Sequence, residues 1–90
     1  MSRPAKSGAE QAPSASEIEV WLQQGFASKL GVETSEIDPT QPAADFGLGS
    51  AALVILSGEL QDWLGRDLEP TIFWDYENLR AIALSLGAKT

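Results

Sequence analysis

The sequence contains no histidine and no cysteine among its 90 residues. Without histidine it lacks the side chain that most often serves as a general base near neutral pH and as a metal ligand. Without cysteine it forms neither disulfides nor thiolate zinc sites, and cysteine usage gives no indication of a redox compartment. Catalytic Ser-His-Asp and Cys-His arrangements are therefore excluded, and we expect no metal site.

Long apolar runs are also missing. No stretch reaches the roughly eighteen apolar residues of a transmembrane helix, and the first residues lack the apolar core of a secretory signal. Hydrophobic residues make up 43% of the chain, which suffices for one small core in a single domain. We therefore expect a cytoplasmic protein without membrane contacts.

Basic residues are scarce. Six Lys and Arg stand against 13 Asp and Glu, which gives a net charge of −7. Between residues 31 and 88 there are ten acidic side chains and only Arg66 and Arg80, a net charge of −8 for that stretch. Such a surface repels nucleic-acid phosphates and anionic lipids, so we expect neither as a partner. It should instead attract basic patches on other proteins.

The chain divides into an N-terminal segment and one domain. Residues 1–15 are mostly Ser, Ala, Pro, Gly and Gln and are expected to form a disordered tail or linker. The domain is expected to span residues 16–88. Its first helix should begin at Ser16, because Ser16 and Glu19 fit a capping box, and should end at Gly31. Its apolar face follows helical spacing through Ile18, Trp21, Leu22, Phe26 and Leu30.

Residues 32–49 contain two prolines and many polar residues, which argues against regular structure. A connection of this length in a small domain is unusual and is commonly functional. Ile37 and Phe46 are isolated apolar residues within it, so they are expected to attach the loop to the core.

Two further helices and one short helix are expected after this loop. The second helix should run from about Ser50 to Gly65, the short one should include Ile72-Phe73-Trp74, and the last should cover residues 77–86 before Gly87. No segment alternates for long enough to form a strand. The predicted fold is all-α, a bundle of three main helices plus one short helix with a long loop between the first and second. The expected core residues are Leu53, Leu56, Leu60 and Leu64 with Val54 and Trp63 beside them, and Leu79, Ile82, Ala83 and Leu86.

The segment Asp45-Phe46-Gly47-Leu48-Gly49-Ser50-Ala51 allows three interpretations. A G-x-S-x-G nucleophile elbow fails because Leu48 and Ala52 occupy the glycine positions. A G-x-G-x-x-A dinucleotide motif fails because no strand and no βαβ unit surround it. The third interpretation is a serine displayed at a helix N-terminus, where an attached anion is favoured. Its alternative is that Ser50 is an ordinary N-cap.

The run DFGLGS, the leucine-striped helix after it, and LGRDLEPTIFWDYENLRAIALSL together resemble the phosphopantetheine-binding carrier family. The resemblance covers about residues 17–87 and is closest to acyl carriers of polyketide and fatty-acid synthesis. In that family a Phe or Tyr and Gly-Leu precede Asp-Ser-Leu, and Phe46, Gly47, Leu48 and Ser50 match. Two positions depart from the family: Gly49 stands where it usually has Asp, and Ala51 where it usually has Leu.

The resemblance implies a carrier and not an enzyme. Ser50 would bear a 4′-phosphopantetheine arm, with Gly49 and Leu48 beside it, and acyl intermediates would be held on the arm as thioesters. The implied partners are a phosphopantetheinyl transferase using coenzyme A and magnesium, an acyl-activating enzyme or acyltransferase, and a ketosynthase or other assembly-line enzyme. The implied docking residues are Ala51, Val54, Ile55, Glu59, Asp62 and Trp74.

Two alternatives stay open. One keeps the fold and changes the cargo, as in a peptidyl or aryl carrier of a peptide synthetase. The other is an unmodified helical protein-interaction module in which Ser50 only caps a helix. Among the aromatic residues, we expect Trp21, Trp63, Phe73 and Tyr76 to pack in or beside the core, and Trp74 to be exposed.

Overall fold

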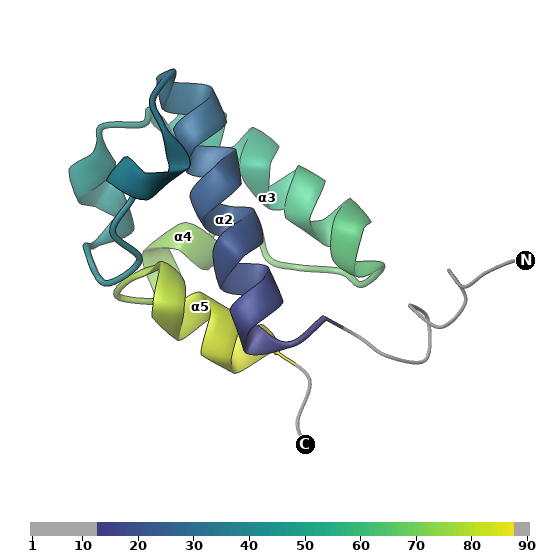
Figure 1. Cartoon of the computed structure of the whole chain (residues 1–90). Helices are drawn as coiled ribbons and strands as arrows, with labels where there is room; N and C mark the ends of the chain where they lie inside the picture. The colour runs from purple at the N-terminus through teal and green to yellow at the C-terminus, as the bar shows by residue number, and fades with distance from the viewer. Residues whose placement is uncertain (1–12, 88–90) are drawn as a thin grey trace, which may run out of the picture.

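A computed structural model describes residues 13–87 of the chain. The predicted tail, residues 1–15, lies almost entirely outside the described residues, so the boundary of the domain stays a prediction. Four α-helices and two short 3-10 helices make up the described part, which contains no strand (Figure 1). The predicted all-α bundle with three main helices, one short helix and a long first loop is confirmed.

The first helix, α2, covers Ala15–Leu30 and begins earlier than predicted. Its capping box is formed by Ser14 and Glu17: the Ser14 Oγ accepts from the Glu17 N–H at 3.2 Å, and Glu17 Oε1 accepts from the Ser14 N–H at 2.8 Å. The predicted box at Ser16 and Glu19 is wrong, because the Glu19 carboxylate accepts from the Arg80 Nε at 3.0 Å. The predicted end is confirmed, since Gly31 adopts a left-handed backbone with φ of 73°.

The connection between α2 and the next long helix contains more regular structure than predicted. It holds two 3-10 helices, η1 (Thr34–Glu36) and η2 (Ala43–Phe46). Ile37 is buried and Phe46 packs against the core, so their predicted anchoring role is confirmed. Ala43 is buried as well. Its burial could not be predicted from the sequence, because alanine is small and polar residues lie close to it along the chain.

Backbone carbonyls of this connection are held by side chains and amides of α2 and α5. Gln23 Nε2 donates to the Ile37 carbonyl at 2.9 Å, and the Arg80 N–H donates to the Pro39 carbonyl at 3.0 Å. Asp38 Oδ1 accepts from both the hydroxyl and the N–H of Thr40, at 2.7 and 2.9 Å. The hydroxyl and then the amide of Thr40 lower the pKa of the Asp38 carboxyl, because both bonds favour its charged form.

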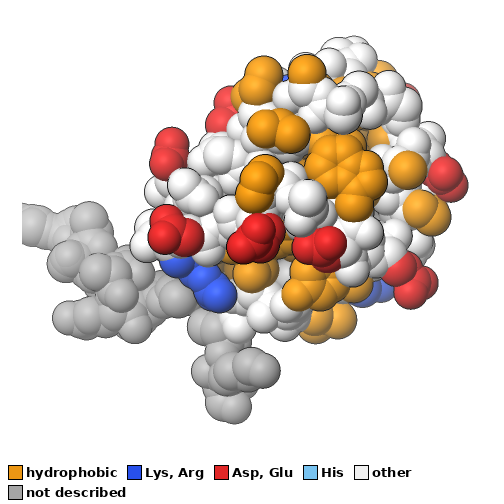
Figure 2. All heavy atoms as spheres, turned by 180° about the vertical axis from the view of Figure 1, so that it is seen from behind, with side chains coloured by type: hydrophobic (Ala, Val, Ile, Leu, Met, Phe, Trp, Pro, Cys, Tyr) orange, Lys and Arg blue, Asp and Glu red, His pale blue; other side chains and the backbone are white. Residues whose placement is uncertain are grey.

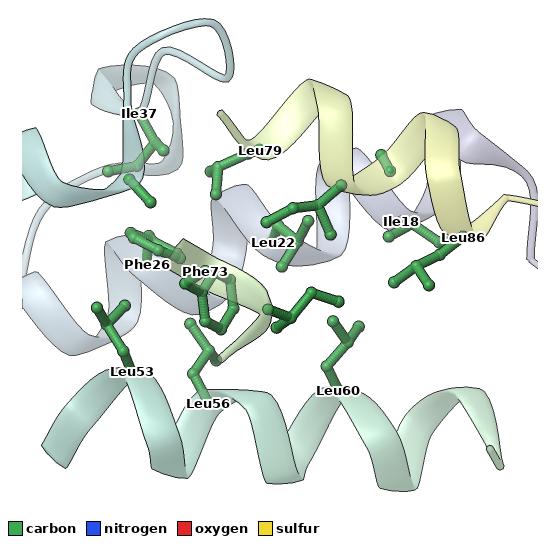
Figure 3. Packing of buried hydrophobic residues seen from close by; sticks show 14 of the residues in the cluster. Ile18, Leu22, Phe26, Ile37, Leu53, Leu56, Leu60, Phe73, Leu79 and Leu86 are labelled. Atoms are coloured by element: carbon green, nitrogen blue, oxygen red, sulfur yellow. The ribbon is translucent and has the colours of Figure 1, made fainter. Parts of the chain in front are cut away.

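The next helix, α3, covers Ser50–Leu64 and ends at Gly65, which has a φ of 71°. Its start and end agree with the prediction. Figure 3 shows Leu53, Leu56 and Leu60 pointing from α3 towards the side chains of α2 and α4. Val54 does not join this core face as predicted but is exposed, because it lies on the side of α3 that faces away from α2.

The short helix α4 covers Ile72–Asp75, and the last helix, α5, covers Leu79–Leu86. The predicted start of α5 at residue 77 is wrong by two residues, because Asn78 caps the helix by accepting from the Ala81 N–H through Oδ1 at 2.7 Å. The predicted end at Gly87 is confirmed. All four predicted core residues of α5 are buried: Leu79, Ile82, Ala83 and Leu86.

Figure 1 shows α2 in the middle of the bundle, with α5 along it in front and α3 passing behind. Within residues 13–87, α2 and α5 make the most extensive backbone contact of any two helices. Where the end of α5 meets the start of α2, a Cβ added to Gly87 would lie 2.6 Å from the Ala15 N. In contrast, α3 meets α2 mainly through side chains, and a Cβ at Gly25 would lie 2.9 Å from the Leu56 Cδ1.

Three phenylalanine rings pack together at the end of the bundle where α3 begins. The ring of Phe26 on α2 contacts Phe46 of η2 and Phe73 of α4 edge to face, with centroid distances of 5.3 and 5.5 Å. Such edge-to-face pairs stabilise beyond the burial of their surface. The predicted burial of Phe73 is confirmed. No helix within residues 13–87 has both the length and the apolar character needed to cross a bilayer.

Candidate functional site

The segment that leads into α3 turns sharply before Ser50. Gly47 follows η2 with a φ of 83°, a left-handed conformation that glycine adopts without steric cost. Leu48 is half-buried and packs against the core, whereas Gly49 and Ser50 are exposed. The turn and the anchored Phe46 thus place Ser50 at the surface, at the N-terminal end of α3.

Ser50 is the first residue inside α3, and Gly49 is its N-cap. The alternative that Ser50 is an ordinary capping residue is therefore wrong: the cap position has no side chain, and no side chain caps the helix. Among residues 13–87 no hydrogen bond engages the Ser50 hydroxyl. An exposed serine side chain without a structural partner is available for chemistry.

The backbone around Ser50 suits an attached anion. The first helical hydrogen bond runs from the Leu53 N–H to the Gly49 carbonyl at 3.1 Å, so the amides of Ser50, Ala51 and Ala52 have no partner within the helix. The first turn contains no acidic residue. These amides and the helix dipole favour a negative group at Ser50.

Space around Ser50 is also open. A Cβ added at Gly49 would have no atom within 4 Å, and the Gly49 backbone has ordinary extended angles, φ −69° and ψ 162°. A chain leaving the Ser50 oxygen meets no obstruction from this side. The geometry therefore fits a phosphodiester-linked arm, and neither space nor backbone strain excludes the Asp that carriers usually have at position 49.

The five predicted docking residues on α3 are all exposed: Ala51, Val54, Ile55, Glu59 and Asp62. Glu59 also forms an ion pair with α2, where Lys29 Nζ lies 3.3 Å from its Oε1. No pattern in the sequence reveals this pair, because its members are 30 positions apart.

The aromatic residues beside the core are more exposed than predicted at two positions. Trp74 is exposed on α4, as predicted, with half of its surface accessible. Trp63 and Tyr76 are 41% and 37% exposed. Trp63 nevertheless packs, because its ring stacks on Trp21 at 5.3 Å between centroids.

Figure 2 views the molecule from behind Figure 1. Hydrophobic side chains lie over the upper and central part of this face and again near its lower edge, and acidic side chains lie between these two areas and at the sides. Basic side chains cover little of the face. This surface thus combines exposed apolar side chains with negatively charged ones.

A family model described as the phosphopantetheine attachment site matches residues 20–86. The chain belongs to this family. Members of the family carry a 4′-phosphopantetheine group and act as carriers rather than catalysts. The predicted family and cofactor class are therefore confirmed, as is the function of a carrier protein domain.

Two curated relatives are informative. The chain is 38% identical over 68 residues to a phenolphthiocerol/phthiocerol polyketide synthase polypeptide of Mycobacterium tuberculosis; the match covers 76% of the chain and 4% of the synthase. It is 36% identical over 75 residues to the acyl carrier protein TtuC of Teredinibacter turnerae, covering 83% of the chain and 86% of that protein. The chain thus spans a small fraction of the synthase and most of TtuC.

Two solved structures share the fold. An acyl carrier protein from Anabaena sp. with a variant phosphopantetheinylation-site sequence has a TM-score of 0.77 and 34% identity, covering 86% of this chain and 88% of that one. A free-standing peptidyl carrier protein from Acinetobacter baumannii has a TM-score of 0.76 and 33% identity, covering 81% and 91%. Both acyl and peptidyl carriers therefore resemble this domain.

Proposed function

We propose that Ser50 is the residue of this carrier domain that receives the 4′-phosphopantetheine arm. The observation that supports the proposal best is the exposed Ser50 hydroxyl on the first turn of α3, in a chain that belongs to the attachment-site family. Leu48 and Gly49 complete the site, because one anchors the turn and the other leaves the approach open.

The proposed modification is a group transfer catalysed by a phosphopantetheinyl transferase with coenzyme A and magnesium. The Ser50 Oγ forms a bond to the phosphorus that bears the pantetheine, and the P–O–P bond of coenzyme A breaks. Adenosine 3′,5′-bisphosphate leaves, and the hydroxyl proton passes to a base of the transferase. This base must come from the transferase, because the chain has no histidine and a serine hydroxyl is a weak nucleophile without one.

Once attached, the arm supplies a thiol on which an acyl chain is held as a thioester. The chain itself catalyses nothing on this proposal. Its residues fix the attachment point, favour the phosphodiester through the first-turn amides, and present the helix surface that enzymes contact. Covalent attachment raises the effective concentration of the intermediate at each docked enzyme.

The proposed partners are the transferase, an acyl-activating enzyme or acyltransferase, and a ketosynthase or other assembly-line enzyme. Carrier domains in polyketide synthases work with assembly-line enzymes. We propose polyketide or fatty-acid intermediates as cargo, in a cytoplasmic setting without nucleic-acid or membrane partners. The proposed contact residues are those predicted on α3 and α4: Ala51, Val54, Ile55, Glu59, Asp62 and Trp74.

A peptidyl or aryl carrier is the second candidate, because a peptidyl carrier shares the fold at 33% identity. The two functions differ in the enzyme that loads the arm. Purified modified protein offered to fatty-acyl, extender-unit and amino-acid activating enzymes should be loaded with an acyl or extender unit. Loading by an amino-acid activating enzyme alone would favour the peptidyl carrier.

The attachment itself is tested by intact mass after incubation with coenzyme A, magnesium and a broad-specificity transferase. We expect a gain of one phosphopantetheine for the wild type and none for Ser50→Ala. Ser16→Ala is the matched control, because Ser16 is also exposed on the first turn of a helix. If the wild type gains no mass, the chain is an unmodified interaction module.

A further inference from the structure

The three long helices of residues 13–87 differ in how their first turns are capped. Ser14 caps α2 through its Oγ, and Asn78 caps α5 through its Oδ1. At the start of α3 the N-cap is Gly49, which has no side chain, and no side chain of another residue takes its place. The attachment residue therefore lies on the one long helix in the described part of the chain that begins without a side-chain cap.

The first-turn amides of α3 are free to bind an anion. Within the described residues, no hydrogen bond uses the amides of Ser50, Ala51 and Ala52. The positive pole of the helix dipole lies at the same end, and unpaired amides at such an end bind phosphate groups. An independent observation points to the ligand, because the family model that matches residues 20–86 describes the attachment site of a phosphate-bearing group.

No side-chain cation within residues 13–87 is placed to compete for this anion. The described residues include three basic side chains. Lys29 and Arg80 form ion pairs with carboxylates, with N–O distances of 3.3 and 3.0 Å. Arg66 follows the C-terminal end of α3, at the opposite end of the helix from Ser50. The electrostatic partners that this part of the chain offers to a phosphate on Ser50 are therefore the first-turn amides.

We propose that the phosphodiester of the arm on Ser50 serves as the missing N-terminal cap of α3, so that modification stabilises the helix that bears it. The first-turn amides donate to the phosphate oxygens, and the helix dipole favours their charge. Because the phosphate is tethered to the first residue of the helix, its effective concentration at these amides is high. The inference rests on the proposed attachment and adds a coupling between modification and stability.

The overall charge of the domain predicts the opposite effect. Residues 13–87 contain 12 acidic and three basic side chains, and a further negative charge on such a surface increases its self-repulsion. Modification should therefore lower the stability unless local contacts outweigh this repulsion. A gain in stability must come from contacts of the phosphate or of the rest of the arm, and variants can separate these two sources.

The residue at position 49 determines the size of the expected gain. An aspartate there would accept from the same first-turn amides and would repel the phosphate beside it. The Gly49 backbone is extended, and an added Cβ meets no atom within 4 Å, so the substitution introduces no strain. Gly49→Asp should stabilise the unmodified domain and remove most of the gain that modification brings.

The first test compares the thermal unfolding of unmodified and fully modified protein by circular dichroism at low salt, with modification verified by intact mass. For the wild type we expect modification to raise Tm by about 2–6 °C. Gly49→Ala is the matched control, because it adds a side chain without a capping group, and it should keep the wild-type gain. In Gly49→Asp the gain should fall below about half of that value.

The capping is refuted if modification leaves the Tm of the wild type unchanged or lowers it. It is also refuted if Gly49→Asp gains as much on modification as Gly49→Ala does. Both outcomes would show that the first-turn amides do not bind the phosphate.

A second pair of variants tests the charge without the arm. Asp and Asn have nearly the same shape, so Ser50→Asp and Ser50→Asn differ mainly by a negative charge on the first residue of α3. At pH 7 the Asp variant should have a Tm about 1–4 °C above that of the Asn variant. The difference should shrink in about 0.5 M NaCl, because salt screens the interaction with the dipole. Equal Tm values at low salt would refute the anion site.

Hydrogen exchange measured by NMR locates the effect. The amides of Ala51 and Ala52 should exchange several-fold more slowly in the modified protein. The amide of Ala81 is the control, because it already donates to Asn78 Oδ1 at 2.7 Å, and its exchange should change little. Equal slowing of all three amides would indicate a general stabilisation and would contradict capping by the phosphate.

The failure of this inference differs from the failure of the proposed function. No gain in mass by the wild type would refute the attachment, and the capping with it. Complete modification of Ser50 without a rise in Tm would refute the capping alone and leave the attachment in place.

Discussion

Helices α5 and α3 both pack against α2, but they do so in different ways. At α5 the backbones approach closely, and Gly87 lies against Ala15. The Glu19 carboxylate on α2 accepts hydrogen bonds from Nε and Nη2 of Arg80 on α5, at 3.0 and 3.3 Å. At α3 the contact is made mostly by long side chains, including the stacked rings of Trp21 and Trp63.

The two contacts suggest different roles: α2 and α5 hold the core together, and the outer side of α3 is left for partners. Each helix of the α2–α5 pair contributes three or more fully buried side chains, and the pair supplies much of the core. The helix α3 buries its leucines on one side and leaves Ser50, Val54 and Ile55 free on the other. A carrier that must meet several enzymes needs such a helix, because contacts on its free side do not disturb the core.

The largest expected effect on the free energy of unfolding comes from a cavity made between α2 and α5. Ile82→Ala removes a fully buried side chain, so we expect a loss of about 2–5 kcal/mol in the free energy of unfolding. Val54→Ala on α3 should change it by less than about 0.5 kcal/mol. Urea unfolding followed by circular dichroism measures both. A similar loss for Val54→Ala would contradict its exposed position on the free side of α3.

A smaller effect should follow from adding one methyl group to a glycine in each region. Gly87→Ala places a Cβ against the Ala15 backbone, which has little freedom to move, and should cost about 1–3 kcal/mol. Gly58→Ala meets no atom within 4 Å and should stabilise α3 by about 0.5–1 kcal/mol. Thermal unfolding compares the two. A neutral Gly87→Ala would mean that the ends of α2 and α5 separate at little cost.

The smallest effect concerns the loop that joins the two regions. Thr40 lowers the pKa of Asp38, so the stabilisation is present above the ordinary aspartate pKa of about 3.9 and is lost as the pH falls through the lower folded value. Thr40→Ala should raise the pKa of Asp38 towards the ordinary value, as measured by NMR titration. Thr34→Ala, a change to an exposed threonine elsewhere in the loop, should leave it unchanged. An equal shift in both variants would contradict the assignment to Thr40.

The sequence predicted the helices where apolar spacing and glycine stops agree. Gly31, Gly65 and Gly87 end the three long helices as expected, and the inward leucines of α3 are buried. The prediction for Val54 was wrong, because an apolar residue next to the row of buried leucines can face either the core or the solvent. Periodicity alone does not distinguish a core residue from an exposed contact residue.

Helix starts were predicted less well, because several residues compete for each cap. Ser14-x-x-Glu17 and Ser16-x-x-Glu19 both fit a capping box; the structure forms the first, and the Glu19 carboxylate accepts from Arg80 instead. At α5, the two side-chain bonds of Asn78, to the Ala81 amide and the Thr40 carbonyl, outweigh the helix preference of Glu77.

The position of Ser50 at the exposed start of α3 was predicted, but its surroundings were not. The position of Ser50 follows from the glycines and the leucine stripe, whereas its place one residue inside the helix depends on the backbone angles of Gly49. The pairing of Glu59 with Lys29 could not be predicted, because it joins residues 30 positions apart through the packing of two helices.

The cap position of α3 has a consequence for redesign. Because Gly49 has an ordinary extended backbone and open space above it, the fold accepts nearly any side chain there, and the loop need not be rebuilt around it. A single substitution can thus change the charge that an approaching enzyme meets first, without altering the bundle beneath. Sets of otherwise identical carriers that differ only at this position could sort transferases by their preference.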